Sequence, residues 1–599
     1  MADVRSPSRM PLAAVWRKQI ESFERQQETQ HRSAIERLQL QQEADPRNAA
    51  TYIQIAHHHQ QMGEHKLALR TLKNGLSISS PSAKLYRYAV NSLAESNQTK
   101  EAIETARLAA NLFPADALFF KLQEKLLLPV IYDTEAEIVY YQRRFLEGIT
   151  ELRATSNANK KLAASEYKHR ALRAIDAHSN FYLPYCGRDI LPLQSAYSEF
   201  ARGILSENYP QWLKPRTIPS IPEGGKIRVG YISPHFGQHS DAKCFLGWLR
   251  ERNRDDFEVF AFQAGADTAY FNDDVRRACD HFSQTSPDLQ RLCEAIHQAD
   301  LHVSVLLDHE PPMMTQLACL RLAPIQCATW GRPVTSGSPA IDYYLSSALV
   351  EPEDGQQHYV ERLHLLPGIG ICFYKPVIPR PLLDLPRSSF GLGNDRTVYL
   401  CCQSVFKYLP QQDGVFLDIA KRNPNAQFVF LTPNQACRDD LRRRLERAFT
   451  AGKLDAADHC VWLPRPLNRF DYWNLHLISD VYLDTFEFSG GVTTLEAIAC
   501  GLPVVTLPGR FHRGRHSCAI LRQLGVTATI ANSHEEYVNI AVRLGQDRDW
   551  RTEIIREMTS RHDSLFADVR PVIALEGFFR QIVTEAAAKQ SVAKYRTHV

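Results

Sequence analysis

The sequence predicts a region of α-helical repeats followed by two α/β domains, each with a doubly wound parallel sheet. Residues from about 49 onwards repeat with a period of about 34 residues. From residue 226 onwards, short apolar runs alternate with helical stretches. A glycine corner at residues 485–496 (TFEFSGGVTTLE) joins one of these runs to a helix. Strands separated by helices are typical of parallel sheets that are covered on both faces, so we expect an α/β protein.

Length and composition limit the classes of protein to consider. A chain of 599 residues is too long for one core, so two to four domains are expected. The contents of 44% hydrophobic and 23% charged residues are ordinary for a globular protein. With 70 Lys and Arg against 67 Asp and Glu, the net charge of +3 provides no strong field to attract nucleic acid or an anionic membrane. An anionic ligand must therefore be held by local groups.

The cysteines and the apolar runs indicate a cellular compartment. The thirteen cysteines are scattered, odd in number and without a Cys-x-x-Cys pair, which favours free thiols in a reducing compartment. No apolar run approaches the roughly 20 residues of a membrane helix. The first twelve residues lack the apolar segment of a signal peptide. We therefore expect a cytoplasmic protein with no membrane span.

The first 214 residues are expected to be helical. Residues 16–42 are polar and favour a leading helix or a partly disordered arm, within an arm of residues 1–48. Within the helical region 49–214, Tyr52 and Ala68 of one unit are answered by Tyr86 and Ala102 of the next, which resembles the tetratricopeptide repeat. A third, degenerate unit begins near Ala117. Because so short an array buries little surface, it should pack on the helices that follow.

The second part of the chain supplies the strands and helices of two sheets. A proline-rich passage at 374–393 divides it into domains at 226–375 and 394–565, followed by a C-terminal helix and tail at 566–599. Ligands of such folds bind outside the carboxyl ends of the strands. The expected strands are 227–232, 257–262, 301–307, 341–345, 398–402, 427–431, 460–463, 481–483 and 504–507, and expected helices include 288–297, 412–422, 438–449 and 537–544.

The glycine corner has the form of a phosphate site. A strand at 480–484 leads to Gly490 and Gly491, and the helix that follows ends at Gly501. Paired glycines let backbone N–H groups approach an anion, and the start of a helix adds partial positive charge. Taken alone, the local pattern more often marks a plain strand-to-helix connection than a phosphate site.

Several segments resemble one enzyme family. Residues 321–326 (RLAPIQ), 330–337 (WGRPVTSG) and 342–344 (DYY) resemble the signature of the bacterial relatives of protein O-GlcNAc transferase, in glycosyltransferase family 41. The family also contains the plant SPINDLY proteins and, more distantly, bacterial N-glucosyltransferases. The resemblance continues, in the family's order, through the segments 180–183 (NFYL), 226–233 (KIRVGYIS), 403–407 (QSVFK) and 485–509. It spans about residues 50 to 565.

This resemblance implies a GT-B enzyme, with two Rossmann-like domains and the nucleotide sugar on the C-terminal one. The implied activity is an inverting protein glycosyltransferase that needs no metal or other cofactor. It moves GlcNAc or glucose from a UDP-sugar to Ser/Thr or Asn side chains, and the repeats present the acceptor polypeptide. Lys407 is the implied partner of the charge that grows on the β-phosphate. His239 is implied near the acceptor, as a base or an orienting group.

The resemblance also implies a set of binding residues. Glu496 is placed to accept ribose hydroxyls, and Tyr472 to stack on the base. Ser489 and Val492 stand where the family usually has Asn and Thr, which makes the loop depend on backbone donors. The implied donor-binding residues are Gln403, Ser404, Lys407, Arg469, Tyr472, Ser489, Gly490, Gly491, Val492, Thr493 and Glu496, and the implied acceptor-side residues are Trp330, Gly331, Pro333 and Thr335.

Other polar groups carry no assigned role. Asp308, His309 and Glu310 follow a strand towards the same cleft, but the glycine expected after the acidic residue is absent. The histidines at 57–59 face different directions on a helix, so solvated or packed side chains are favoured over a metal site. Asp547 and Asp549 have the spacing of a metal-dependent transferase, yet lie far beyond the glycine corner, which favours a solvated turn.

Two further functions stay open at the level of sequence. A GT-B enzyme acting on small molecules, such as a nucleotide-sugar epimerase, would not need the repeats. A scaffold without catalytic activity would fit the changes at Ser489 and Val492 but not the presence of Lys407 and His239. The sequence leaves open the sugar, the linkage, the acceptor proteins, the catalytic base and the oligomeric state.

Overall fold

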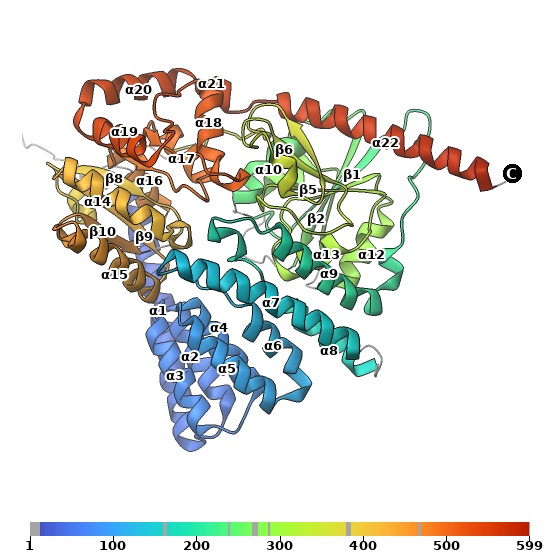
Figure 1. Cartoon of the computed structure of the whole chain (residues 1–599), viewed down its shortest axis with the longest axis horizontal. Helices are drawn as coiled ribbons and strands as arrows, with labels where there is room; N and C mark the ends of the chain where they lie inside the picture. The colour runs from blue at the N-terminus through green and yellow to red at the C-terminus, as the bar shows by residue number, and fades with distance from the viewer. Residues whose placement is uncertain are drawn as a thin grey trace, which may run out of the picture.

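The computed structural model describes residues 12–159, 165–237, 240–265, 273–285, 288–378, 385–464 and 469–597. Figure 1 shows three parts: a helical region in blue and cyan, a first α/β unit in green and yellow-green, and a second α/β unit in orange and red. The fold class predicted from the sequence is confirmed. The two α/β units lie side by side, and the helical region runs along both of them.

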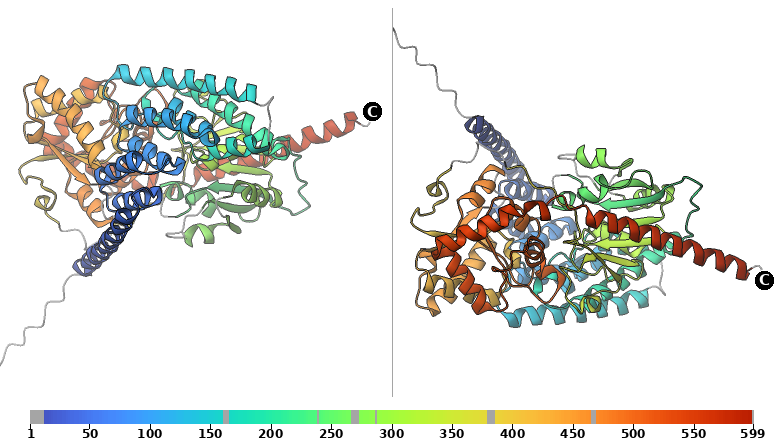
Figure 2. Two further views of the ribbon diagram at one scale, coloured as in Figure 1. Left: turned by 90° about the horizontal axis from the view of Figure 1, so that it is seen from below. Right: turned by 90° about the horizontal axis from the view of Figure 1, so that it is seen from above.

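The N-terminal helices follow the predicted repeat. After α1 (Leu12–Ala44), which extends away from the body in Figure 2, the pairs α2/α3, α4/α5 and α6/α7 follow one another. Helices α2, α4 and α6 begin at Ala49, Ala83 and Ala117, at the roughly 34-residue interval of the repeat. The third unit therefore keeps the register of the first two. The bounds are α2 (Ala49–Gln61), α3 (His65–Ile78), α4 (Ala83–Glu95), α5 (Thr99–Leu112), α6 (Ala117–Leu126) and α7 (Glu135–Asn159).

Small residues allow the paired helices to approach closely. A Cβ atom on Gly75 would lie 2.8 Å from Cγ of Tyr52, and Ala68 and Ala102 are fully buried. Of the histidines of α2, His57 is exposed and His58 and His59 are partly buried. His59 Nδ1 lies 2.7 Å from Oε2 of Glu64. The repeat pattern thus reflects side-chain size at the helix contacts.

The first sheet has seven parallel strands in the order β3-β2-β1-β4-β5-β6-β7. Helices α8 (Ser165–Asp176) and α9 (Leu191–Asn208) lead into it from the repeats. Its strands are β1 (Ile227–Ser233), β2 (Phe257–Ala264), β3 (His281–Thr285), β4 (Val303–Leu306), β5 (Ile325–Thr329), β6 (Tyr343–Ser347) and β7 (Arg362–Leu366), with helices α10 (Ser240–Arg250), α11 (Asp273–Ala278), α12 (Leu289–Gln298) and α13 (Pro312–Cys319).

The sequence did not predict three of these strands. β3 and β7 are the two edges of the sheet and carry polar or charged residues, so they lack the apolar run of a central strand. β5 is central and buried, but its residues Ile325–Thr329 include Gln and Thr and are too few to stand out. The other strands of this sheet lie within a few residues of the predicted positions.

The second sheet has five parallel strands in the order β10-β9-β8-β11-β12, all of them predicted. They are β8 (Thr397–Cys401), β9 (Ala426–Thr432), β10 (Cys460–Pro464), β11 (Val481–Leu483) and β12 (Val504–Val505). The helices are α14 (Asp413–Arg422), α15 (Gln435–Ala451), α16 (Arg469–Ile478), α17 (Val492–Ala499), α18 (His516–Leu524), α19 (His534–Gln546), α20 (Arg548–Ser560) and α21 (His562–Leu565). Asp547 caps α20, since its side chain accepts from the N–H of Trp550.

The C-terminal helix α22 (Arg570–Thr597) returns to the first α/β unit. The ring of Phe578 stacks on His364 of β7, with centroids 3.6 Å apart, and meets the edge of Tyr343 of β6. Gln590 Oε1 accepts a hydrogen bond from the N–H of Ile218 at 2.7 Å. The chain therefore crosses between the two α/β units twice.

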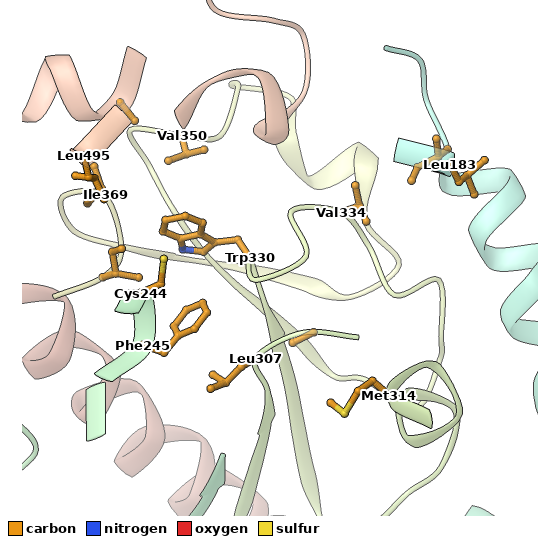
Figure 3. Close-up of a cluster of buried hydrophobic side chains, with 14 of the residues drawn as sticks. Leu183, Cys244, Phe245, Leu307, Met314, Trp330, Val334, Val350, Ile369 and Leu495 are labelled. Atoms are coloured by element: carbon orange, nitrogen blue, oxygen red, sulfur yellow. The ribbon is translucent and has the colours of Figure 1, made fainter. Parts of the chain in front are cut away.

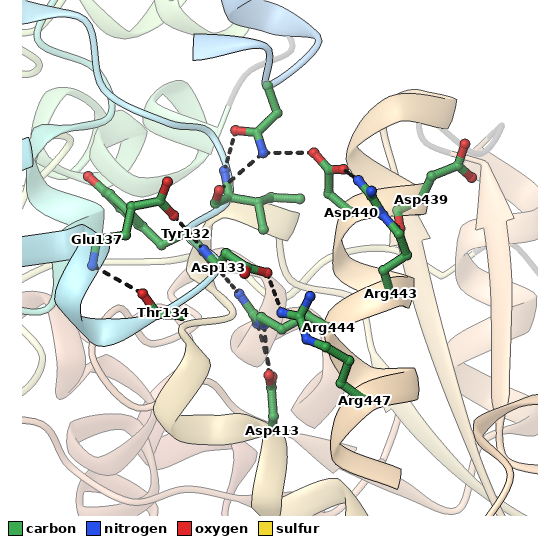
Figure 4. A network of polar contacts seen from close by, with 12 residues as sticks. Tyr132, Asp133, Thr134, Glu137, Asp413, Asp439, Asp440, Arg443, Arg444 and Arg447 are labelled. Carbon is green, nitrogen blue, oxygen red and sulfur yellow. Dashed lines mark hydrogen bonds and ion pairs between the residues drawn. The ribbon is translucent and has the colours of Figure 1, made fainter. Parts of the chain in front are cut away.

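A buried arginine joins the helical region to the second α/β unit (Figure 4). The guanidinium of Arg444 on α15 donates to both oxygens of Asp413, at 2.8 and 3.0 Å. It also donates to the carbonyl of Tyr132, in the turn before α7, at 2.7 Å. Nearby, Nδ2 of Asn97 donates to Ile131 and to Asp440 of α15, at 3.1 and 2.8 Å. These bonds fix the repeats to the second unit.

The structure also describes the state of the cysteines and the hydropathy of the helices. All thirteen cysteines are free thiols and twelve of them are buried. Within the described ranges, no helix is both long and apolar enough to cross a membrane.

Candidate active site

The glycine corner is built around a buried carboxylate. Asp484 follows β11, and its Oδ1 accepts from the N–H of Gly490 at 2.8 Å. Its Oδ2 accepts from the hydroxyls of Ser489 and Thr506, at 2.7 and 2.8 Å. Burial raises the pKa of Asp484, and these hydrogen bonds act in the opposite direction. The loop is thus held from inside by its own side chains.

The two glycines have different reasons to be glycine. At Gly490 a Cβ atom would clash with Gln403 and would lie 2.5 Å from the hydroxyls of Thr494 and Tyr482. At Gly491 a Cβ would meet nothing closer than 3.6 Å. Gly491 precedes α17 and supplies no side-chain cap, and the first N–H groups of such a helix can bind an anion.

Lys407 reaches this loop from the neighbouring strand. It ends the short turn after β8, and its Nζ donates to Oε1 of Gln403 at 2.9 Å and to the carbonyl of Ser489 at 3.2 Å. The ammonium also lies 4.7 Å from the ring centre of Phe488. The N–H of Lys407 bonds the carbonyl of Ser404 at 2.9 Å. The predicted pair of lysine and glycine loop is therefore brought together.

Hydroxyl groups of the loop are engaged within the protein. Nε2 of Gln403 donates to Thr493 Oγ1 at 3.2 Å and bonds the hydroxyl of Tyr482. The hydroxyl of Ser489 donates a hydrogen bond to Asp484, and its Oγ also lies 3.0 Å from Oγ of Ser517. The hydroxyls of Ser489 and Thr493 are therefore bonded within the protein.

Glu496 sits one turn into α17 and is only 5% exposed. Its Oε2 accepts from the hydroxyl of Tyr472 at 2.9 Å, and its Oε1 accepts from Nζ of Lys243 at 2.8 Å. Burial, with Glu496 beside it, raises the pKa of Tyr472 well above its usual value. Because Lys243 lies on α10 of the first α/β unit, this ion pair joins the two units at the site. The sequence analysis did not identify Lys243.

Trp330 brings the first sheet to the loop. It follows β5, and its Cζ3 would lie 3.8 Å from a Cβ on Gly491. Figure 3 shows the indole in a cluster of buried side chains that includes Phe245 and Cys244 of α10 and Leu495 of α17. The ring of Trp330 also lies 4.7 Å from that of His516. The predicted acceptor-side tryptophan and the predicted donor loop thus face each other.

The other residues predicted on the acceptor side contact residues of the first α/β unit. Gly331 leaves no room for a Cβ against the carbonyl of Leu307. Thr335 is buried and donates from Oγ1 to Oε2 of Glu361 at 2.6 Å. Pro333, which lies between Gly331 and Thr335 in the sequence, is also buried. Only Trp330 of this group is seen next to the loop.

Two predicted residues fall outside this description. His239 lies outside the described residues. Arg469 is the first residue of α16, but its side chain is not described. Val492 begins α17 and is half-buried.

Among the described residues, no group of three or more His, Cys, Asp or Glu side chains could hold a metal ion.

Asp308, His309 and Glu310 are structural groups at the junction with the helical region. His309 Nε2 lies 3.0 Å from the carbonyl of Val334. Glu310 pairs with Arg332 at 3.1 Å and accepts from the hydroxyl of Ser179 at 2.7 Å. Burial raises the pKa of Glu310 to about 7 and lowers that of His309 to about 4.

Sequence comparison assigns the chain to a family. The model of glycosyl transferase family 41 matches residues 211–372 and 376–574. The probable UDP-N-acetylglucosamine–peptide N-acetylglucosaminyltransferase SPINDLY of Arabidopsis thaliana is 27% identical over 332 residues, which cover 54% of this chain and 35% of that protein. The corresponding protein SEC of the same plant is 25% identical over 362 residues, or 58% of this chain and 36% of that protein. This chain thus matches about a third of the length of these relatives.

Structure comparison agrees. A mutant of the Thermobaculum terrenum O-GlcNAc transferase superposes with a TM-score of 0.65 at 20% sequence identity, covering 97% of this chain and all of that one. This likeness shows the fold, a GT-B arrangement of two Rossmann-like units behind a helical repeat region. With three fifths of its length matched by the family model, the chain belongs to glycosyl transferase family 41.

Proposed function

We propose that this protein is an inverting, metal-independent protein glycosyltransferase that uses a UDP-sugar, with GlcNAc or glucose as the sugar. The observation that carries the proposal is the placement of the Lys407 ammonium against the loop of Gly490 and Gly491, opposite Trp330 of the other α/β unit. Family membership supports the same reaction class.

The chemistry follows from the leaving group. Departure of a nucleoside diphosphate puts negative charge on the β-phosphate, and preorganised donors stabilise that charge in the transition state. Lys407 supplies a cation, and the uncapped N-terminus of α17 supplies backbone N–H groups and its dipole. Glu496 would take the ribose hydroxyls, with Tyr472 and Arg469 near the base. His239 would serve the acceptor, as base or orienting group.

The acceptor is proposed to be a polypeptide carried by the repeats. Three repeat units follow one another beside the second α/β unit, and stacked helical repeats can offer an extended surface to a bound polypeptide. Transfer to Ser/Thr hydroxyls or Asn amides is compatible with this arrangement. The free thiols favour a reducing compartment, so we place the reaction in the cytoplasm.

The test is a transfer reaction with defined products. Purified protein is incubated with labelled UDP-GlcNAc, UDP-glucose or GDP-fucose and a cell lysate, with EDTA present, and intact proteins are examined for added sugar. We expect label on polypeptides from a UDP-sugar. Consumption of the donor with label only on small molecules would indicate another GT-B enzyme, and the absence of nucleotide binding in calorimetry would indicate a scaffold.

A further inference from the structure

Two histidines stand where the α/β units meet, next to the proposed donor loop. His512 lies in the short helix η10 (His512–Gly514), and His516 begins α18. His512 is 2% exposed and His516 is 5% exposed. In both rings Nε2 is buried, and no hydrogen-bond partner for it is found in the described part of the chain. Buried polar atoms are nearly always bonded, so two unpartnered nitrogens in adjacent rings call for an explanation.

His516 is the one that faces the glycine loop. Its Nδ1 would lie 3.6 Å from a Cβ on Gly491, and its ring packs on Trp330 with centroids 4.7 Å apart. Burial lowers the pKa of His516 well below the usual value, and the nearby His512 and Lys407 lower it further. A neutral imidazole carries one N–H donor and one acceptor. With its proton on Nδ1, the nitrogen that faces Gly491, His516 has a donor to offer to an anion at this loop.

His512 and its partners keep this ring in place. His512 Nδ1 lies 2.8 Å from Oε1 of Glu351, and the hydroxyls of Ser346 and Tyr359 lie 3.2 and 3.1 Å from the same nitrogen. Glu351, Ser346 and Tyr359 all belong to the first α/β unit. The rings of His512 and His516 are 4.9 Å apart. His516 is thus enclosed by Trp330 on one side and by an anchored imidazole on another.

The glycine loop lacks a side-chain hydroxyl donor at Val492. Val492 has no hydroxyl, and the hydroxyls of Ser489 and Thr493 are bonded within the protein. Lys407 approaches from the side of β8, whereas His516 approaches from α18. Two donors from different directions can bind two oxygens of one diphosphate. A single lysine would leave one direction to backbone groups alone.

We propose that His516 is a donor-binding residue whose imidazole donates a hydrogen bond to the diphosphate of the nucleotide sugar at Gly491. The inference rests on the proposed function, because it requires a nucleoside diphosphate at this loop. It assigns to the loop a side-chain donor in place of the hydroxyl that Val492 lacks. The competing explanation is a histidine that only fills space against Trp330.

The experiment measures binding of UDP and of uridine, which has no phosphate. Calorimetry and NMR competition experiments measure ligand affinity for the wild-type chain and for three variants, His516→Leu, His516→Gln and His459→Leu. His459 is a matched control: it is buried in the second α/β unit just before β10, and its Nδ1 bonds the carbonyl of Ala426 at the start of β9. We expect His516→Leu to weaken UDP binding at least tenfold, His516→Gln to stay within threefold because its amide retains an N–H, and His459→Leu to match the wild type. Uridine should bind all four proteins equally.

Each result decides between the two explanations. Wild-type UDP affinity in His516→Leu, or equal losses for UDP and uridine, overturns the role of His516 while the proposed function stands. Failure of the wild type to bind any nucleoside diphosphate overturns both. If His516→Leu does not fold, ¹⁵N-histidine spectra of the wild type decide: UDP must shift an imidazole signal that is missing from His516→Gln, and no such shift overturns the inference.

Discussion

Lys243 and Glu496 form an ion pair between the two α/β units, with Nζ 2.8 Å from Oε1. The other oxygen of Glu496 accepts from Tyr472, so each carboxylate oxygen has one partner. The lysine side chain is 49% exposed and the glutamate 6% exposed. Under the proposed role of Glu496, a ribose hydroxyl would share the carboxylate with Lys243 or replace its ammonium, and nucleotide binding would be coupled to the contact between the units.

Glu496→Gln should weaken the binding of UDP about tenfold, because a hydrogen bond to a charged acceptor contributes roughly 1.5–3 kcal/mol. Calorimetry with the purified variant measures this. Glu553→Gln on the exposed face of α20 is the control and should bind UDP like the wild type. Equal affinity for Glu496→Gln and wild type would remove Glu496 from the donor site.

Lys407→Ala should reduce sugar transfer by a factor on the order of 10²–10³, since it removes one preorganised donor to the leaving group. The fold should be kept, because the ammonium is only partly buried and bonds a side-chain amide and one carbonyl. Transfer assays and circular dichroism check the two points. Lys421→Ala, at the exposed end of α14, should be fully active. A fully active Lys407→Ala would refute the site assignment.

Arg444→Met should lower the free energy of unfolding by about 3–5 kcal/mol, because it leaves the buried Asp413 without its cation. The bond to the carbonyl of Tyr132 is lost as well, which loosens the repeats from α15. Arg442→Met, on the exposed side of the same helix, should change stability by less than about 0.5 kcal/mol. Thermal unfolding followed by circular dichroism compares the two variants, and similar midpoints would contradict the prediction.

Glu310 should make stability fall as pH rises from about 4.5 to about 7. Its folded pKa of about 7 exceeds the usual 4.5, so the folded protein binds a proton that the unfolded chain has released. That proton's contribution is complete below pH 4.5 and is lost above about 7, to the extent of roughly 3 kcal/mol. Denaturation of the wild type and of Glu310→Gln at pH 5 and pH 8 isolates the contribution of this proton to the free energy of unfolding. The stability difference between the two proteins should shift in favour of the variant at pH 8; no shift would exclude a raised pKa.

Much of the fold could be predicted because its signals are local. The interval from Ala49 to Ala83 and Ala117 is repeated in the sequence, and the strands of the second sheet are short apolar runs between helices. The edge strands β3 and β7 gave no such signal, since an edge position tolerates polar residues. The return of α22 to the first unit depends on contacts such as Phe578 on His364, which no local pattern encodes.

The site was predicted where residues lie close in sequence and missed where they meet only in space. Lys407 and the glycine loop come from motifs within one α/β unit. Lys243 and His516 face residues more than 180 positions away, Glu496 and Trp330, so their position became evident only in the fold. The spacing of His512 and His516 after Pro508 was a visible signal without an assigned meaning.

The helical region is attached to both α/β units. Arg444 and Asn97 connect it to the second unit, while Ser198 donates to the carbonyl of Ser336 in the first at 2.8 Å. These bonds tie the helical region to both units, and we expect them to restrain rotation of one unit against the other. Under the proposed function, nucleotide exchange would then proceed through side-chain and loop movements near Lys243, and the distance between labels on α12 and α20 should stay constant when UDP binds.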